Sequence, residues 1–179
     1  MLHVEGSMAE IHNDPEALFQ MSVTKSNGHE LSLEDHEGYV TIFAVVPTKF
    51  PGMAKFYYDM LEHIGLIYPF TVQFLLLPWQ TQDTNDPVDL ESLFVQRRYP
   101  KPHVVLLEPA SQPTNVLSYL LQADIVAGND DALLKEDRVT TFLISSDGMY
   151  IERLLSPTIT LLERRIAVYL QQLSMAREL

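Results

Sequence analysis

Histidine and carboxylate side chains come closest together between residues 29 and 37. His29 and His36 stand there among acidic side chains, which are Glu30, Glu34, Asp35 and Glu37. Imidazole nitrogens and carboxylate oxygens are ligands for zinc and for hard cations. However, none of the six histidines has a second ligand four residues away on a convincing helical face, as zinc enzymes require. We interpret the segment as a solvated turn and predict no metal site.

The residues that usually perform nucleophilic catalysis are missing or lack their motif. The chain has no cysteine, which excludes disulfides, thiolate metal sites and thiol redox chemistry. Ser145 and Ser146 are not part of a G-x-S-x-G elbow. Asp130 and Asp131 lack the downstream residues of a calcium-binding loop. We therefore predict no catalytic residue and no cofactor.

Composition and charge limit the class of partner. A chain of 179 residues, 46% hydrophobic and 20% charged, is typical of one globular domain. Its net charge of −12 disfavours nucleic acid and anionic lipid. No apolar run approaches the roughly 20 residues of a membrane span, and the first 18 residues lack a basic leader region. We expect no membrane insertion and, by default, a cytoplasmic location, with an organelle left open.

Strands are predicted from short apolar runs rich in β-branched residues. They are expected at residues 40–46, 70–77, 104–107, 140–145 and 150–155. A hairpin is expected around Ser26-Asn27-Gly28, because an Asn-Gly pair accepts the positive φ that a two-residue turn needs at both positions. The polar residues 1–17 are expected to form a mobile N-terminal arm, which leaves 18–179 as the folded domain.

Helices are predicted where apolar residues recur at three- and four-residue spacing. They are expected at residues 53–64, 89–98, 115–122 and 160–175. Gly65 is expected to end the first helix, and Thr160 with Glu163 has capping-box spacing at the start of the last. The early strand–helix–strand order predicts a parallel crossover, and the late hairpin adds antiparallel strands. We therefore predict an α/β fold of thioredoxin-like arrangement, with a mixed central sheet, helices on both faces and an N-terminal hairpin.

The order and spacing of several short motifs resemble those of the glutathione peroxidases from about Leu18 to Leu173. The matching segments are residues 26–33, 38–43, 74–78, Asn85 with 89–94, 142–148 and 152–158. The family places its nucleophilic cysteine or selenocysteine in an A-S-K-C-G-like turn after the first core strand. Pro47-Thr48-Lys49-Phe50 occupies that turn, so Phe50 stands at the nucleophile's position. A phenyl ring has no lone pair with which to attack a peroxide, so thiol peroxidase chemistry is excluded.

The other catalytic positions implied by the resemblance have also changed. Thr81 matches the family's glutamine, although a shift of one residue would restore Gln80 or Gln82. Asp137 and Arg138 match its Trp-Asn pair. The resemblance therefore implies a thioredoxin-like scaffold whose catalytic residues are degenerate.

Aromatic residues are predicted to gather on the rim of the former active site. They are Phe50, Pro51 beside it, Trp79, and Phe56 or Tyr57. Large apolar rings exposed together mark a contact site, whereas rings that fill the vacated pocket would only stabilise the domain. Both readings stay open from the sequence.

The leading hypothesis is a non-catalytic protein-interaction module, or a subunit of a larger assembly, with a protein partner. The acidic composition favours a basic partner, and a homo-oligomer is left open. The alternative is a small-molecule binding protein or non-thiol enzyme that uses Gln80, Gln82, Asp137 or Arg138. Residual peroxidase activity is the least expected function.

Overall fold

A five-stranded mixed sheet forms the centre of the computed structural model, which describes residues 14–80, 103–126, 134 and 138–178. The strands, in spatial order, are β5 (Val104–Leu106), β4 (Val72–Trp79), β3 (Val40–Pro47), β6 (Thr140–Ile144) and β7 (Ile151–Leu155). β3, β4 and β5 are parallel, whereas β6 runs antiparallel to β3 and to β7. The predicted α/β fold with a mixed sheet is confirmed.

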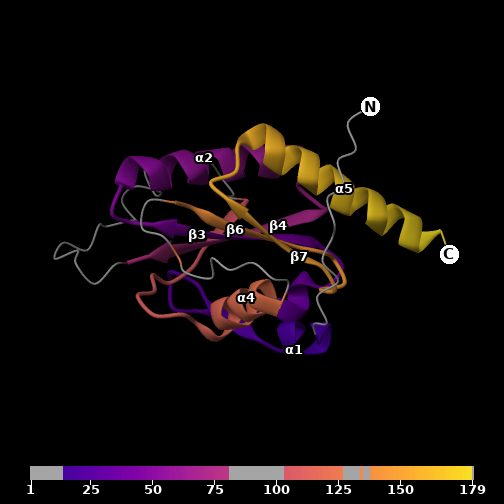
Figure 1. Cartoon of the computed structure of the whole chain (residues 1–179), viewed down its shortest axis with the longest axis horizontal. Coiled ribbons are helices and arrows are strands. Elements are labelled where there is room, and N and C mark those ends of the chain that lie inside the picture. The colour runs from indigo at the N-terminus through magenta and orange to yellow at the C-terminus, as the bar shows by residue number, and fades with distance from the viewer. Residues whose placement is uncertain (1–13, 81–102, 127–133, 135–137, 179) are drawn as a thin grey trace.

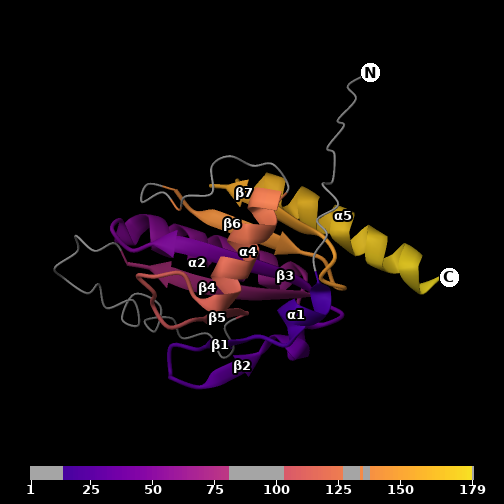
Figure 2. The ribbon, with the colours of Figure 1, turned by 60° about the horizontal axis from the view of Figure 1, so that its bottom comes forward.

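Helices cover both faces of this sheet (Figure 1). α2 (Pro51–Ile67) and α5 (Ile159–Arg177) lie on one face, and α1 (Pro15–Phe19) and α4 (Asn115–Val126) lie on the other (Figure 2). Because both faces are covered, every residue of β3 is buried, as its largely apolar sequence requires.

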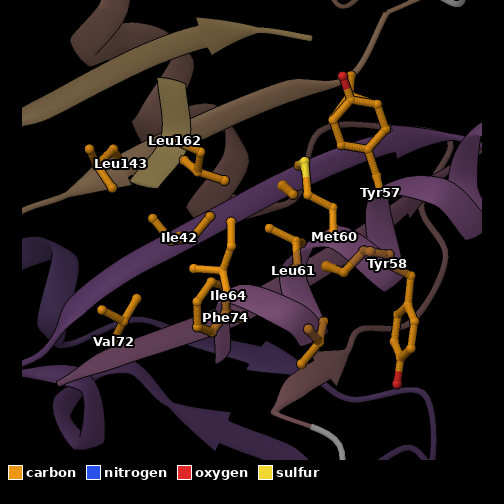
Figure 3. Close-up of a cluster of buried hydrophobic side chains, with 14 of the residues drawn as sticks. Ile42, Tyr57, Tyr58, Met60, Leu61, Ile64, Val72, Phe74, Leu143 and Leu162 are labelled. Atoms are coloured by element: carbon orange, nitrogen blue, oxygen red, sulfur yellow. The ribbon is translucent and has the colours of Figure 1, made fainter. Parts of the chain in front are cut away.

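Alternation along the strands divides the core into two clusters. The upper cluster, beneath α2 and α5, includes Ile42 of β3 and Phe74 of β4. Figure 3 shows that Met60, Leu61 and Ile64 of α2 belong to the same cluster. The lower cluster, against α4 and α1, contains the intervening strand residues together with Leu18, Leu33, Val116, Leu117 and Leu120.

The predicted end of α2 at Gly65 is wrong. The helix continues to Ile67, and the Tyr68 amide donates to the Ile64 carbonyl (N···O 3.1 Å). Gly65 is buried inside the helix, where a Cβ atom would collide with the side chain of His103. A glycine is therefore needed for the close approach of α2 to the residue before β5, and not for termination.

The N-terminal hairpin consists of β1 (Ser22–Thr24) and β2 (Glu30–Ser32). Only Gly28 in its turn has a positive φ (+80°), so the predicted positive φ at Asn27 is wrong. The Asn27 side chain instead accepts from the His29 amide (3.1 Å), and Gly28 N donates to Lys25 O (2.8 Å). The longer turn thus needs only one left-handed residue.

Two helix starts also differ from the predictions. α1 includes residues 15–17, which the sequence assigned to the arm, while residues 1–13 and the predicted helix 89–98 lie outside the described residues. The N-cap of α5 is Thr158, whose hydroxyl accepts from the Leu161 amide (3.2 Å), so the predicted Thr160–Glu163 capping box is wrong. The helix begins earlier because Thr158, with extended backbone (ψ 159°), already offers the capping hydroxyl.

Candidate functional site

The turn that the resemblance compares with the peroxidase nucleophile's turn follows β3, at the carboxyl ends of β3 and β4. The two strands are parallel, with Pro47 opposite Trp79. Thr48 joins the ends, because its amide (2.9 Å) and its hydroxyl (3.2 Å) both donate to the Trp79 carbonyl. The structure therefore brings the turn before α2 and the end of β4 together, as the resemblance implies.

Phe50 stands on the surface of this region. It is 48% exposed and forms the N-cap of α2, without a side-chain capping hydrogen bond. Its carbonyl accepts from the amides of Met53 (3.0 Å) and Ala54 (3.2 Å), and the next residue, Pro51, is also exposed. This exposure favours a position on the rim over a ring that fills a vacated pocket.

Two of the predicted aromatic residues, Trp79 and Tyr57, pack against different core clusters. Trp79 is half-buried and packs against the lower cluster, whereas Tyr57 is buried in the upper cluster and its hydroxyl donates to the Pro157 carbonyl (3.4 Å). The sheet separates the two side chains, because Trp79 at the end of β4 points to the lower cluster while Tyr57 lies on α2, which covers the other face. Burial raises the pKa of the Tyr57 hydroxyl, which is therefore neutral at physiological pH.

Phe56 is the aromatic residue that remains outside with Phe50. It is 64% exposed and meets the edge of the Tyr57 ring, with ring centroids 5.7 Å apart and planes at 87°. Edge-to-face pairs of this kind hold a ring in a defined orientation. Phe50 at the N-cap of α2 and Phe56 in its second turn are thus two exposed phenyl rings near the start of this helix.

The polar candidates are only partly described. Gln80 is half-buried, and its amide donates to the Ala110 carbonyl (2.8 Å), which fixes the backbone after β4. Arg138 is exposed just before β6. Thr81, Gln82 and Asp137 lie outside the described residues.

Other groups with catalytic potential have structural partners. Ser145 and Asp147 are bonded to each other (Oγ···Oδ1 2.6 Å), and Ser145 Oγ accepts from the Tyr150 amide (2.9 Å), which closes the β6–β7 turn. His29 is exposed while His36 is buried. No group of three potential metal ligands occurs within the described part of the chain. In the same part, no helix is long and apolar enough to cross a membrane.

A second group of exposed apolar side chains, at the opposite end of α2, was not predicted from the sequence. Leu66 is 67% exposed, Ile67 49% and Phe70 83%. Leu66 falls outside the helical spacing that marks the buried face, and Phe70 lies in the turn to β4. These two positions are the only feature of the sequence that could have predicted exposed apolar side chains at this end of α2.

Comparison with known proteins defines the fold class. No protein-family model matches the chain, and no curated protein matches its sequence. Among solved structures, a protein named Trgpx in its apo form has 18% identity and a TM-score of 0.55, over 88% of this chain and 95% of that one. A putative thioredoxin from Neisseria meningitidis has 16% identity and a TM-score of 0.56, over 84% and 87%. BsSco, of the Sco family of cytochrome c oxidase assembly proteins, has 13% and 0.53, over 86% and 91%.

Such low identities establish the fold and nothing finer. The protein has a thioredoxin-like fold, which its mixed sheet and two helical layers show independently. Its structural neighbours include proteins named for thiol–disulfide chemistry, which a chain without cysteine cannot perform.

Proposed function

We propose that the protein is a catalytically degenerate relative of the glutathione peroxidases that serves as a non-catalytic interaction module. The observation that carries the proposal is the exposed Phe50 at the position where the family has its nucleophile. The absence of cysteine from the whole sequence supports it, as does the structural similarity to Trgpx. Assignment to the glutathione peroxidases themselves rests on the order of the sequence motifs.

The proposed contact surface is the amino-terminal end of α2, with Phe50 and Phe56 as the anchoring side chains. Exposure of a phenyl ring to water is unfavourable in free energy, and contact with another apolar surface removes this cost. Buried aromatic anchors surrounded by polar side chains are typical of binding hot spots. Lys49 and Lys55 are the exposed sequence neighbours of these rings, and Lys55 pairs with Asp59 (3.2 Å), so charged side chains adjoin the proposed anchors, as in the rim of an interface.

Trp79 belongs to the domain core and is not proposed as an anchor. Its side chain packs against the lower cluster, so its removal would leave a cavity as well as change the surface. A variant that combines Phe50 with Trp79 would therefore confuse lost binding with lost stability. The matched variant is Phe50→Ala/Phe56→Ala, because both rings are largely outside the core.

Affinity capture of the tagged full chain from its own cells tests the proposal. We expect a stoichiometric partner with the wild type, none with Phe50→Ala/Phe56→Ala, and the same partner with Met149→Ala. Met149 is a suitable control because it is 43% exposed on the β6–β7 turn. Recovery of the protein alone, or equal capture by the double variant, would contradict the proposal.

The partner's charge can be measured in the same system. The net charge of −12 favours association with a basic protein through long-range attraction. We therefore expect the association rate to fall as the salt concentration rises. A rate that does not change with salt would leave the apolar contact but reject a basic partner.

The alternative function, a small-molecule site with non-thiol chemistry, retains Gln80 and Arg138 as its described candidates. A ligand that binds only the native state must raise the melting temperature. A concentration-dependent rise that Gln80→Ala or Arg138→Ala abolishes would favour this alternative over the interaction module.

A further inference from the structure

His36 occupies a buried position between the N-terminal hairpin and the sheet. It ends the 3₁₀ helix η1 (Leu33–His36), which connects β2 to β3. Its side chain is 5% exposed, and Nδ1 lies 3.4 Å from the hydroxyl of Thr41 on β3, which is 4% exposed. Among the described residues, the hydrogen-bond partner of this imidazole is thus a neutral hydroxyl and not a carboxylate.

A protonated imidazole at this position would be poorly compensated. A buried charge loses solvation free energy unless an opposite charge or several hydrogen bonds replace water. Burial therefore lowers the pKa of His36, and the charge of Asp35, which is exposed, opposes this effect only in part. The elements packed against η1 contribute Glu16 on α1 and Glu30 on β2, and both carboxylates are exposed.

The segment that contains His36 holds the N-terminal elements on the sheet. The Leu33 amide donates to the Met21 carbonyl (2.9 Å), and the Leu33 side chain is buried in the lower cluster with Leu18 of α1. The Gly38 amide donates to the Ser146 carbonyl (2.8 Å) beyond β6. η1 is therefore one of the places at which the hairpin and α1 are joined to the sheet.

We propose that His36 is an acid-sensitive latch whose protonation opens η1 and uncovers Leu18 and Leu33. In the closed state the imidazole is buried and neutral, whereas in the open state water solvates the imidazolium. Below the ordinary pKa of 6.5 the open state binds the additional proton, so a fall in pH favours opening. For each unit by which the closed state lowers the pKa, the opening equilibrium increases up to about tenfold.

The opening is local because other contacts of the N-terminal elements do not titrate in this range. The Tyr119 hydroxyl donates to the Asp14 carbonyl (2.9 Å), and burial raises its pKa further above neutrality. The Glu108 amide donates to the Thr24 carbonyl (2.9 Å), which ties β1 to the chain after β5. α1 and the hairpin therefore remain attached at their far ends while η1 opens.

Nuclear magnetic resonance of the full chain tests the latch in two ways. The imidazole signals of the wild type give the pKa of His36, and we expect a value below 6.5. Amide exchange between pH 7.5 and 5.0, corrected for intrinsic rates, gives the opening of η1. We expect protection of the Leu33 and Gly38 amides to fall up to about tenfold per unit of pKa difference.

Variants separate the latch from general acid sensitivity. His36→Gln keeps a neutral polar side chain and is expected to remove the pH dependence of both amides, whereas His29→Gln, at an exposed site, keeps it. The Tyr150 amide, bonded to Ser145, is expected to show no comparable change. A His36 pKa at or above 6.5, constant protection in the wild type, or an unchanged fall in His36→Gln would each overturn the proposal. If His36→Gln does not fold, the wild-type titration and exchange decide it.

Discussion

The two ends of α2 expose similar apolar side chains for different structural reasons. At the amino-terminal end, Phe50 follows the carboxyl end of β3, where the family resemblance locates chemistry, and Phe56 lies in the second turn of the helix. At the other end, Leu66 and Phe70 belong to the connection into β4. Exposure alone therefore does not identify the functional surface. We prefer the amino-terminal end because it follows the end of β3, where the family resemblance locates the catalytic residues.

The largest effect on stability is expected at Trp79, whose side chain is neither fully exposed nor fully buried. Trp79→Ala is expected to lower the free energy of unfolding by about 2–4 kcal/mol, because the half-buried indole packs against the lower cluster. Phe50→Ala, on the exposed rim, is expected to change it by less than about 1 kcal/mol. Urea unfolding measures both values. Equal losses would show that Phe50 is a core residue and would remove the basis for a contact surface.

The carboxyl-terminal end of α2 packs closely against His103 through Gly65. Gly65→Ala is expected to lower the free energy of unfolding by about 1–3 kcal/mol, because its Cβ would collide with His103. Gly52→Ala, at the amino-terminal end of α2, is the matched control, because nothing lies within 4 Å of the added Cβ. It is expected to leave the free energy of unfolding unchanged or to raise it. Urea unfolding of the pair gives the difference, and equal stability would contradict the close approach.

The smallest effect on the free energy of unfolding is expected at Tyr57, the buried neighbour of the exposed Phe56. Tyr57→Phe removes the hydroxyl, which donates to the Pro157 carbonyl and also bonds with Ser156, and is expected to lower the free energy of unfolding by about 0.5–1.5 kcal/mol. Partner capture should stay unchanged, because the hydroxyl is inside. Loss of capture at unchanged stability would instead place Tyr57 in the interface.

Sequence reasoning predicted the sheet well because its signals are local. β3 and β4 are apolar runs with one polar residue each, Thr41 and Gln73, and the buried face of α2 follows helical spacing. Neither pattern needs knowledge of distant contacts. Gly65 was misassigned because its reason is His103, which lies 38 residues away in the chain. No local pattern distinguishes a glycine that ends a helix from one that allows a close approach.

The candidate site was predicted in position and not in detail. The turn before Phe50 and the end of β4 are adjacent because the strands are parallel neighbours, as their order implies, and because their register aligns Pro47 with Trp79. The side on which Trp79 packs depends on strand alternation carried through to its last residue, and the sequence analysis did not extend β4 that far. The exposure of Leu66 depends on which face of α2 meets the sheet at its end, which is a property of tertiary packing.

The most direct test is the affinity of the captured partner for two matched double variants. Phe50→Ala/Phe56→Ala is expected to raise the Kd at least about 30-fold, which corresponds to about 2 kcal/mol for a binding anchor. Leu66→Ser/Phe70→Ser, at the far end of α2, is expected to leave the Kd within about threefold. Isothermal titration calorimetry on folded proteins of equal stability gives both values. The reverse order, with the larger loss at Leu66 and Phe70, would contradict the account.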